Sequence, residues 1–213
     1  MSLATAGALS GRIPGGDEPH YLIIAQSLLK DGDLRIQNNH DRADYLDYYD
    51  KGLPPDFQKR GLDGEIYSIH APGVAVLILP VFAVAGYPGS VVLIALLVAA
   101  ALASNWRVAF DVAGDASSAW AGALAVGSCA TVFFHSFSIF PDPVGWVVVS
   151  AALALLVRLA LVPAGVRTWH GAATGAVVGT LPWAPTRVAG IAAAPGPVVG
   201  ARVWGRAVRW GSG

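Results

Sequence analysis

Long apolar segments fill the middle of the chain and limit the folds open to it. They run over residues 71–85, 90–106, 117–140 and 143–162, and a weaker one runs over residues 171–194. A helix that crosses a bilayer needs roughly 20 mainly apolar residues. The chain is 54% hydrophobic and 13% charged, and its mean hydropathy of +0.54 lies outside the range of ordinary soluble domains. We therefore predict an all-α, multi-pass transmembrane protein.

The charged residues are unevenly distributed, although the formal net charge is zero. Eleven of the fourteen acidic residues precede residue 66, and none follows Asp142. No basic excess is present to attract phosphates, so a nucleic-acid partner is not expected. The uneven distribution of acidic residues instead indicates how the chain is placed relative to a lipid bilayer. The apolar segments predict the bilayer as a partner.

Composition divides the chain into four parts. Residues 1–16 hold an apolar stretch too short to span, and we interpret them as a remnant that lacks a first transmembrane helix. Residues 17–70 are acidic and rich in turn formers, which predicts an extracytoplasmic loop. Residues 71–194 form the transmembrane region. Residues 195–213 are rich in Gly, Pro, Arg and Trp, which fits either a basic juxtamembrane tail or a shifted reading frame.

A short helix is predicted near the start of the acidic loop. Pro19 suits a first helical turn and Gly32 suits a helix end. Tyr21, Ile24 and Leu28 share one stripe of this helix. With about three turns the helix is too short to cross a membrane, so we expect it to lie along the membrane interface.

Residues 71–85 decide the expected topology. These fifteen residues would form a helix of roughly 22 Å, shorter than a hydrocarbon core of roughly 30 Å. We therefore expect a juxtamembrane or re-entrant helix, and the two spans that follow return Asp142 to the face that holds Asp17 and Glu18. If residues 71–85 do cross, Asp142 lies on the opposite face.

The arginines agree with the first of these topologies. It places Arg107, Arg158 and Arg167 near the cytoplasmic ends of the spans, as the positive-inside rule requires. Arg187 and the acidic loop then lie near the outer face.

The acidic pair and its helix resemble a known class of enzymes. Asp17 and Glu18 precede the pattern Y-x-I-x-A-x-S-L-L-x-D-G-D-L, and a proline-containing juxtamembrane helix and a further loop acid follow. From about residue 13 to 190 the chain resembles the GT-C class of integral-membrane glycosyltransferases. Within that class it is most similar to the dolichyl-phosphate-mannose-protein mannosyltransferase-like family and the lipid A aminoarabinose transferases.

This resemblance implies an activity and a location. It implies a multi-pass protein of a bacterial cytoplasmic membrane that transfers a sugar from a polyprenyl-phosphate donor to an acceptor at the outer face. The acceptor is left open.

The resemblance also implies roles for three acids. Asp17 matches the catalytic base, Glu18 is its neighbour, and Asp142 matches a second loop acid that orients the acceptor or a metal. A carboxylate is suited to accept the proton of an acceptor hydroxyl. The alternative for each acid is a helix cap, because both Pro19 and Pro143 begin predicted helices.

Four further residues are candidates for substrate binding. His70 and Arg187 match positions that contact the donor head group and its phosphate, and Tyr48 and His20 lie in the loop that would receive the sugar. The alternatives are an interfacial histidine, a snorkelling arginine and an interfacial tyrosine belt.

Metal binding and two other functions stay open. Asp17, His20, His70 and Asp142 are compatible with a divalent-metal site, but their spacing matches no known ligand pattern. The chemistry requires no cofactor. The rival functions are a transporter or permease fragment, for which a proline-broken helix is typical, and a non-catalytic membrane interaction subunit.

Overall fold

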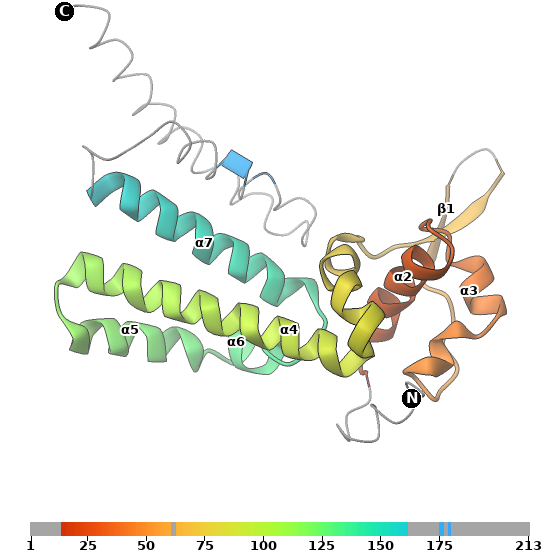
Figure 1. The fold of residues 1–213 in the computed structure, drawn as a ribbon, viewed down its shortest axis with the longest axis horizontal. Helices are drawn as coiled ribbons and strands as arrows, with labels where there is room; N and C mark the ends of the chain where they lie inside the picture. The colour runs from red at the N-terminus through yellow and green to blue at the C-terminus, as the bar shows by residue number, and fades with distance from the viewer. Residues whose placement is uncertain (1–13, 61–62, 162–174, 177–178, 180–213) are drawn as a thin grey trace, which may run out of the picture.

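The chain forms two parts, which we call the head (residues 14–85) and the arm (residues 87–161) (Figure 1). The tail over residues 195–213 and most of the fifth apolar segment lie outside the described residues. The computed structural model describes residues 14–60, 63–161, 175–176 and 179.

Helix α2 (Glu18–Lys30) is the centre of the head. Pro19 occupies its first turn, and Gly32, with φ of +73°, follows its end. These bounds confirm the helix that the sequence predicts. The expected one-sided apolar stripe is wrong, because every residue from Tyr21 to Ala25 is at most 6% exposed. Helix α2 is therefore a core helix of the head.

Short elements surround α2. The two strands form an antiparallel hairpin in which Phe57 pairs with Ser68. The prediction of an all-α fold is therefore wrong here. β2 alternates between half-buried and buried residues, whereas β1 is exposed throughout, so only one strand carries a recognisable strand pattern. The elements are α3 (Gln37–Asp41), the 3-10 helix η1 (Asp44–Asp47), β1 (Phe57–Arg60) and β2 (Glu65–Ser68).

A polar network fastens α3 and η1 to the end of α2. Asn39, which is fully buried, donates hydrogen bonds to Asp31 at 2.8 Å and to Asp44 at 2.9 Å. Arg42 bridges the same two carboxylates at 2.7 and 2.9 Å, and Lys30 contacts Asp44 at 2.8 Å. The loops of the head are thus held by hydrogen bonds to charged groups, which are stronger than neutral ones.

Helix α4 (Gly73–Ala113) runs from the head into the arm and bends at Gly86. Gly86 has φ of 60° and ψ of −153°, a conformation open essentially to glycine alone. The first part of α4 contributes Ile78 and Phe82 to the core of the head. The bend confirms that residues 71–85 do not continue straight into the next apolar segment.

The arm contains the rest of α4 together with α5 (Ala116–Gly127), α6 (Ala130–His135) and α7 (Pro141–Leu161). After α4 leaves the head, α5 and α6 return toward it and α7 leaves again beside α4 (Figure 1). The expected single helix over residues 117–140 is wrong. It breaks after Gly127, where the Ser128 hydroxyl bonds to the Ala125 carbonyl oxygen at 3.3 Å and competes with helical hydrogen bonding.

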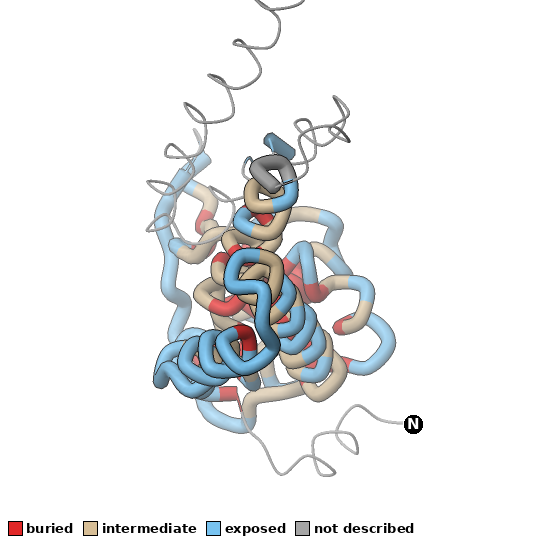
Figure 2. Tube along the Cα trace, turned by 90° about the vertical axis from the view of Figure 1, so that its left-hand side faces the viewer, coloured by how far each residue is buried: buried red, intermediate tan, exposed pale blue. Residues whose placement is uncertain are grey.

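Among the described residues, two helices are long and apolar enough to cross a membrane by length and composition: α4 and residues Pro141–Arg158 of α7. Only 33% and 22% of their most apolar windows are fully buried within the molecule. Most of the other residues of the α7 window are half-buried, whereas those of α4 are half-buried or exposed. Exposed residues also make up nearly all of α5 (Figure 2). The chain is mostly helical, with two candidate membrane-spanning helices.

Candidate functional site

Glu18, in the first turn of α2, is 3% exposed. Its Oε1 accepts a hydrogen bond from the Ile139 backbone N–H at 2.7 Å, and its Oε2 accepts one from the Gly15 N–H at 2.9 Å. The Tyr87 hydroxyl donates to both oxygens at 3.3 and 3.4 Å. These donors compensate for the desolvation of a buried carboxylate. Glu18 therefore joins the start of α2, the bend of α4 and the linker before α7.

Asp17 has the opposite environment, although it is the adjacent residue. Its side chain is exposed and, within the described part of the chain, makes no hydrogen bond or ion pair. Asp17 occupies the N-cap position of α2, but its side chain makes no capping hydrogen bond. Its neighbour Glu18 instead accepts a hydrogen bond from the N–H of Gly15. Both oxygens of Asp17 are left accessible to a ligand.

The acids of the predicted site lie around Tyr21. Burial, and then the negative charges of Asp17 and Asp142, raise the pKa of the Tyr21 hydroxyl to about 12. The Tyr21 ring lies 4.9 Å from the His70 ring and 6.4 Å from the Phe140 ring, centroid to centroid. Asp17 and Asp142 therefore both lie near Tyr21, and the predicted membrane topology stays a prediction.

The sequence analysis placed Tyr21 only on the apolar stripe of the predicted helix and did not include it among the site residues. A signal was present, because a tyrosine on a buried stripe needs a polar place for its hydroxyl.

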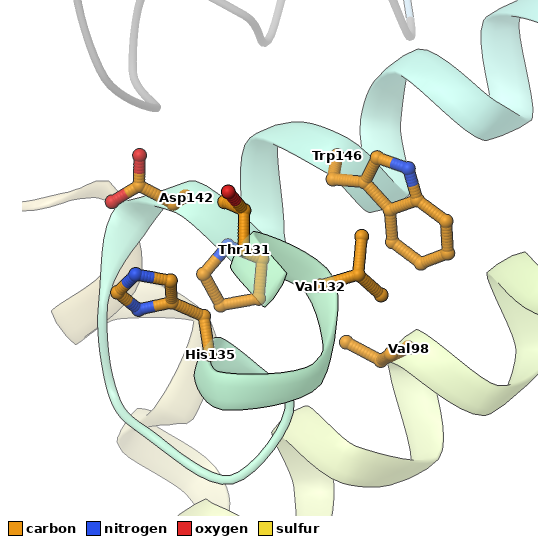
Figure 3. Close-up of a pocket in the computed structure, with 7 residues that line it drawn as sticks. Val98, Thr131, Val132, His135, Asp142 and Trp146 are labelled. Carbon is orange, nitrogen blue, oxygen red and sulfur yellow. The ribbon is translucent and has the colours of Figure 1, made fainter. Parts of the chain in front are cut away.

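Asp142, in the first turn of α7, lines a cavity of about 60 Å³. Figure 3 shows Asp142 and His135 at one end of this cavity and Trp146 and Val98 at the other. Asp17 is not among the residues that line this cavity. The lining is mainly apolar, which leaves Asp142 and His135 as its titratable groups.

Tyr48 lies at a second cavity, of about 100 Å³, where the head meets the bend of α4. Lys30, Asp47 and Phe82 line the same cavity. The Tyr48 hydroxyl is buried without a hydrogen-bond partner among the described residues, and burial raises its pKa well above the ordinary value. Glu18 is close to this cavity through Tyr87, which lines it and donates to Glu18.

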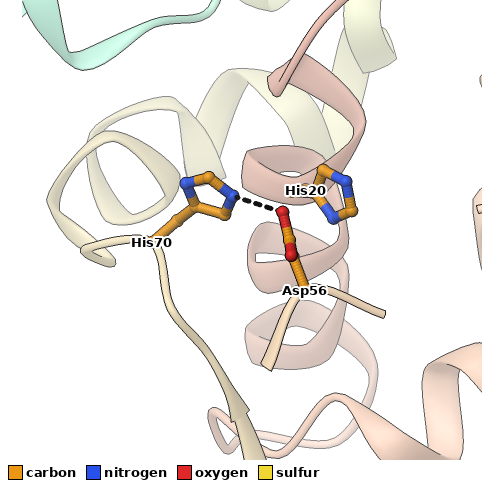
Figure 4. Close-up of side chains that lie close together, drawn as sticks. All are labelled: His20, Asp56 and His70. Carbon is orange, nitrogen blue, oxygen red and sulfur yellow. Dashed lines mark ion pairs between the residues drawn. The ribbon is translucent and has the colours of Figure 1, made fainter. Parts of the chain in front are cut away.

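His20 and His70 come together, as two of the four residues considered for a metal. Their rings stack at 5.4 Å between centroids, and Asp56, which the sequence analysis did not select, lies with them (Figure 4). Burial and the nearby His70 lower the pKa of His20, although Asp56 and Asp17 act in the opposite direction. Asp17 and Asp142 are not part of this group.

The structure thus places Asp17, Glu18, His20, His70 and Asp142 around one end of the helices, with Tyr48 at a neighbouring cavity. Arg187 lies outside the described residues, so its assignment to the donor phosphate stays a prediction. No family model, curated protein or solved structure matches this chain.

Proposed function

We propose that the chain is a multi-pass membrane protein that transfers a sugar from a polyprenyl-phosphate donor to an acceptor at the outer membrane face. One observation carries the proposal. Asp17 is an exposed carboxylate without a hydrogen-bond or ion-pair partner in the described residues, and its buried neighbour Glu18 fixes it to the head end of an apolar arm.

In the proposed reaction an acceptor hydroxyl oxygen forms a bond to the anomeric carbon of the sugar. The hydroxyl proton passes to the Asp17 carboxylate, which acts as general base. The bond from the anomeric carbon to the lipid phosphate breaks, and the phosphate leaves with the electron pair. Glu18 acts as a positioning residue, because its oxygens are already engaged by backbone and tyrosine donors. Asp142 is proposed to orient the acceptor.

The placement of charge favours this proposal over a transporter. Residues 88–104 of α4 and 143–157 of α7 contain no charged side chain, whereas transporters place ionisable groups near the bilayer midplane. Asp17, Glu18 and Asp142 lie instead at the head end of the arm, where a lipid phosphate and a water-soluble acceptor can meet.

The test is the substitution Asp17→Asn, assayed in proteoliposomes with mannose, glucose and aminoarabinose carried on polyprenyl phosphate. Loss of a general base should lower transfer by about 10²- to 10⁴-fold. The unfolding midpoint should not change, because the Asp17 side chain makes no bond in the described structure. Asp50→Asn is the matched control, since Asp50 is another exposed acid of the head, and it should retain full transfer.

Equal transfer by wild-type and Asp17→Asn protein would contradict the proposal and favour a non-catalytic interaction subunit. The absence of transfer by the wild-type protein with all three donors would overturn it as well.

A further inference from the structure

Three side chains from distant parts of the head converge on one point. His20 comes from the first turn of α2, Asp56 from the residue before β1, and His70 from the segment between β2 and α4. One potential ligand atom from each lies within 4.8 Å of the other two. In Figure 4 the Asp56 carboxylate lies between the two imidazole rings.

Backbone hydrogen bonds position two of these residues. The Ile69 N–H donates to the Asp56 carbonyl oxygen at 3.2 Å, which extends the hairpin by one bond beyond the pair of Phe57 and Ser68. The His70 N–H donates to the Ser68 hydroxyl oxygen at 3.1 Å. Asp56 and His70 therefore lie opposite each other at the open end of the hairpin.

Packing fixes the imidazole of His70. Its side chain is 11% exposed, and its ring contacts the rings of Tyr21 and His20. His20 is held beside it because α2 packs against the first part of α4. The ligand atoms are thus held by the fold before any ligand arrives, which is how a preorganised site differs from a chance cluster.

The imidazole of His70 also lacks a hydrogen-bond partner. Its Nε2 is buried and accepts or donates no hydrogen bond within the described residues. The nearest carboxylate oxygen, Oδ2 of Asp56, lies 3.7 Å away, which is beyond hydrogen-bond distance. A buried ring nitrogen without a partner carries a desolvation cost, and a metal ion between the two groups would remove that cost.

We propose that His20, Asp56 and His70 bind one divalent transition-metal ion, and that Zn²⁺ is the ion of best fit. Two imidazole nitrogens and one carboxylate oxygen are an established ligand set for zinc. Ligand atoms about 2.0–2.1 Å from a tetrahedral ion lie roughly 3.3 Å from one another. The present separations of up to 4.8 Å would therefore have to shorten by at most about 1.5 Å when an ion binds.

Binding would have two consequences. The ion would tie α2, the start of the hairpin and the start of α4 together, so it should raise the stability of the head by mass action. Three protein ligands also leave a fourth position of a tetrahedral ion open to water or a substrate oxygen.

The test is a Zn²⁺ titration of the whole chain in detergent, after treatment with a chelator, in competition with a chromophoric indicator. We expect one ion for each chain and a higher unfolding temperature, with no competition from Mg²⁺, which prefers all-oxygen sites. Asp56→Asn and His70→Ala should each weaken binding by about 100-fold or more. This readout does not use sugar transfer, so it can succeed where the proposed activity fails.

Controls separate the site from general metal affinity. Asp56 is half exposed, so Asp56→Asn should fold even if His70→Ala does not. Asp63→Asn, an exposed acid at the other end of the hairpin, and His135→Ala, a histidine of the arm, should bind Zn²⁺ as the wild type does. Unchanged affinity in Asp56→Asn, or no binding to wild-type protein at excess Zn²⁺, would overturn the proposal.

Discussion

The head and the arm use apolar residues in opposite ways. In the head, the residues of α2 from Tyr21 to Ala25 are buried on all sides, and ion pairs cover the loops around them. In the arm, apolar side chains face outward on several helices, and they include Val92, Leu96, Val112, Trp120, Leu124, Phe133 and Phe134.

This difference in the exposure of apolar side chains indicates what surrounds the head and the arm. A soluble protein exposes scattered apolar side chains, but it rarely exposes contiguous apolar faces on helices as long as α4. Ion pairs and polar side chains cover the loops of the head, whereas the arm exposes apolar side chains that a covering of lipid or protein would bury. Glu18 connects the two parts, and three predictions test how independent they are.

The largest effect is expected for Glu18→Ala. The substitution leaves the Ile139 N–H, the Gly15 N–H and the Tyr87 hydroxyl without the Glu18 acceptor. The Ile139 N–H is a buried donor, and its hydrogen bond to a charged group contributes about 1.5–3 kcal/mol. With the bonds from Gly15 and Tyr87 to Glu18 lost as well, we expect the free energy of unfolding to fall by about 3 kcal/mol or more. Denaturant unfolding in detergent measures it. Glu65→Ala is the control, since Glu65 forms a surface ion pair with Arg35, and a loss above about 1 kcal/mol there would contradict the comparison.

A second prediction compares two leucines of nearly equal exposure. Leu96 in the arm is 64% exposed and Leu46 in the head is 60% exposed. An arginine in the middle of a lipid-facing helix costs about 2.5–3.5 kcal/mol, whereas an exposed substitution in water changes stability by at most about 0.5 kcal/mol. Leu96→Arg should therefore reduce the fraction of chain retained in alkali-washed membranes, while Leu46→Arg should not. Equal retention would show that lipid does not cover this face of the arm.

The smallest effect concerns acid stability and should be confined to the head. Burial raises the pKa of the Asp44 carboxyl, but hydrogen bonds from Lys30, Arg42 and Asn39 outweigh this and lower it to about 2. Because the folded pKa lies below the ordinary 3.8, the contribution of Asp44 to stability is complete above that pH. It is lost as the pH falls toward 2.

We expect this contribution to be about 1 kcal/mol, since solvent screens such a network. Unfolding midpoints measured as the pH falls from 5 through this window should drop less in Asp44→Asn than in wild type. Asp50→Asn should follow the wild type. An identical pH dependence in all three proteins would remove Asp44 from the acid response.

Local patterns in the sequence predicted the local structure well. Pro19 and Gly32 gave the bounds of α2 to within two residues, and the length of the segment over residues 71–85 predicted a separate helix. Predictions that used hydropathy alone failed over short stretches of the chain. Hydropathy is continuous from residue 117 to 127 and beyond, so it concealed the break that Gly127 and Ser128 impose.

Residues brought together by long-range pairing were not predictable in this way. Asp56 was assigned to a loop because it directly follows Pro54 and Pro55. Its approach to His70 depends on a hairpin in which one strand is exposed throughout. Asn39 has no pattern around it that indicates full burial. The sequence alone could not distinguish the roles of Asp17 and Glu18. The hydrogen bonds from Ile139 and Tyr87 show that Glu18 is the buried carboxylate that joins the two parts, whereas Asp17 is the accessible one.

The bend at Gly86 sets where one environment ends and the other begins. As a straight rod, the 41 residues of α4 would measure about 60 Å, twice the roughly 30 Å thickness of a hydrocarbon core. Residues on both sides of Gly86 are equally apolar. Hydropathy alone therefore does not indicate which part of α4 would lie within a membrane. Because Gly86 has no side chain, the helix can change direction there. The position of the whole head relative to the arm depends on this change of direction.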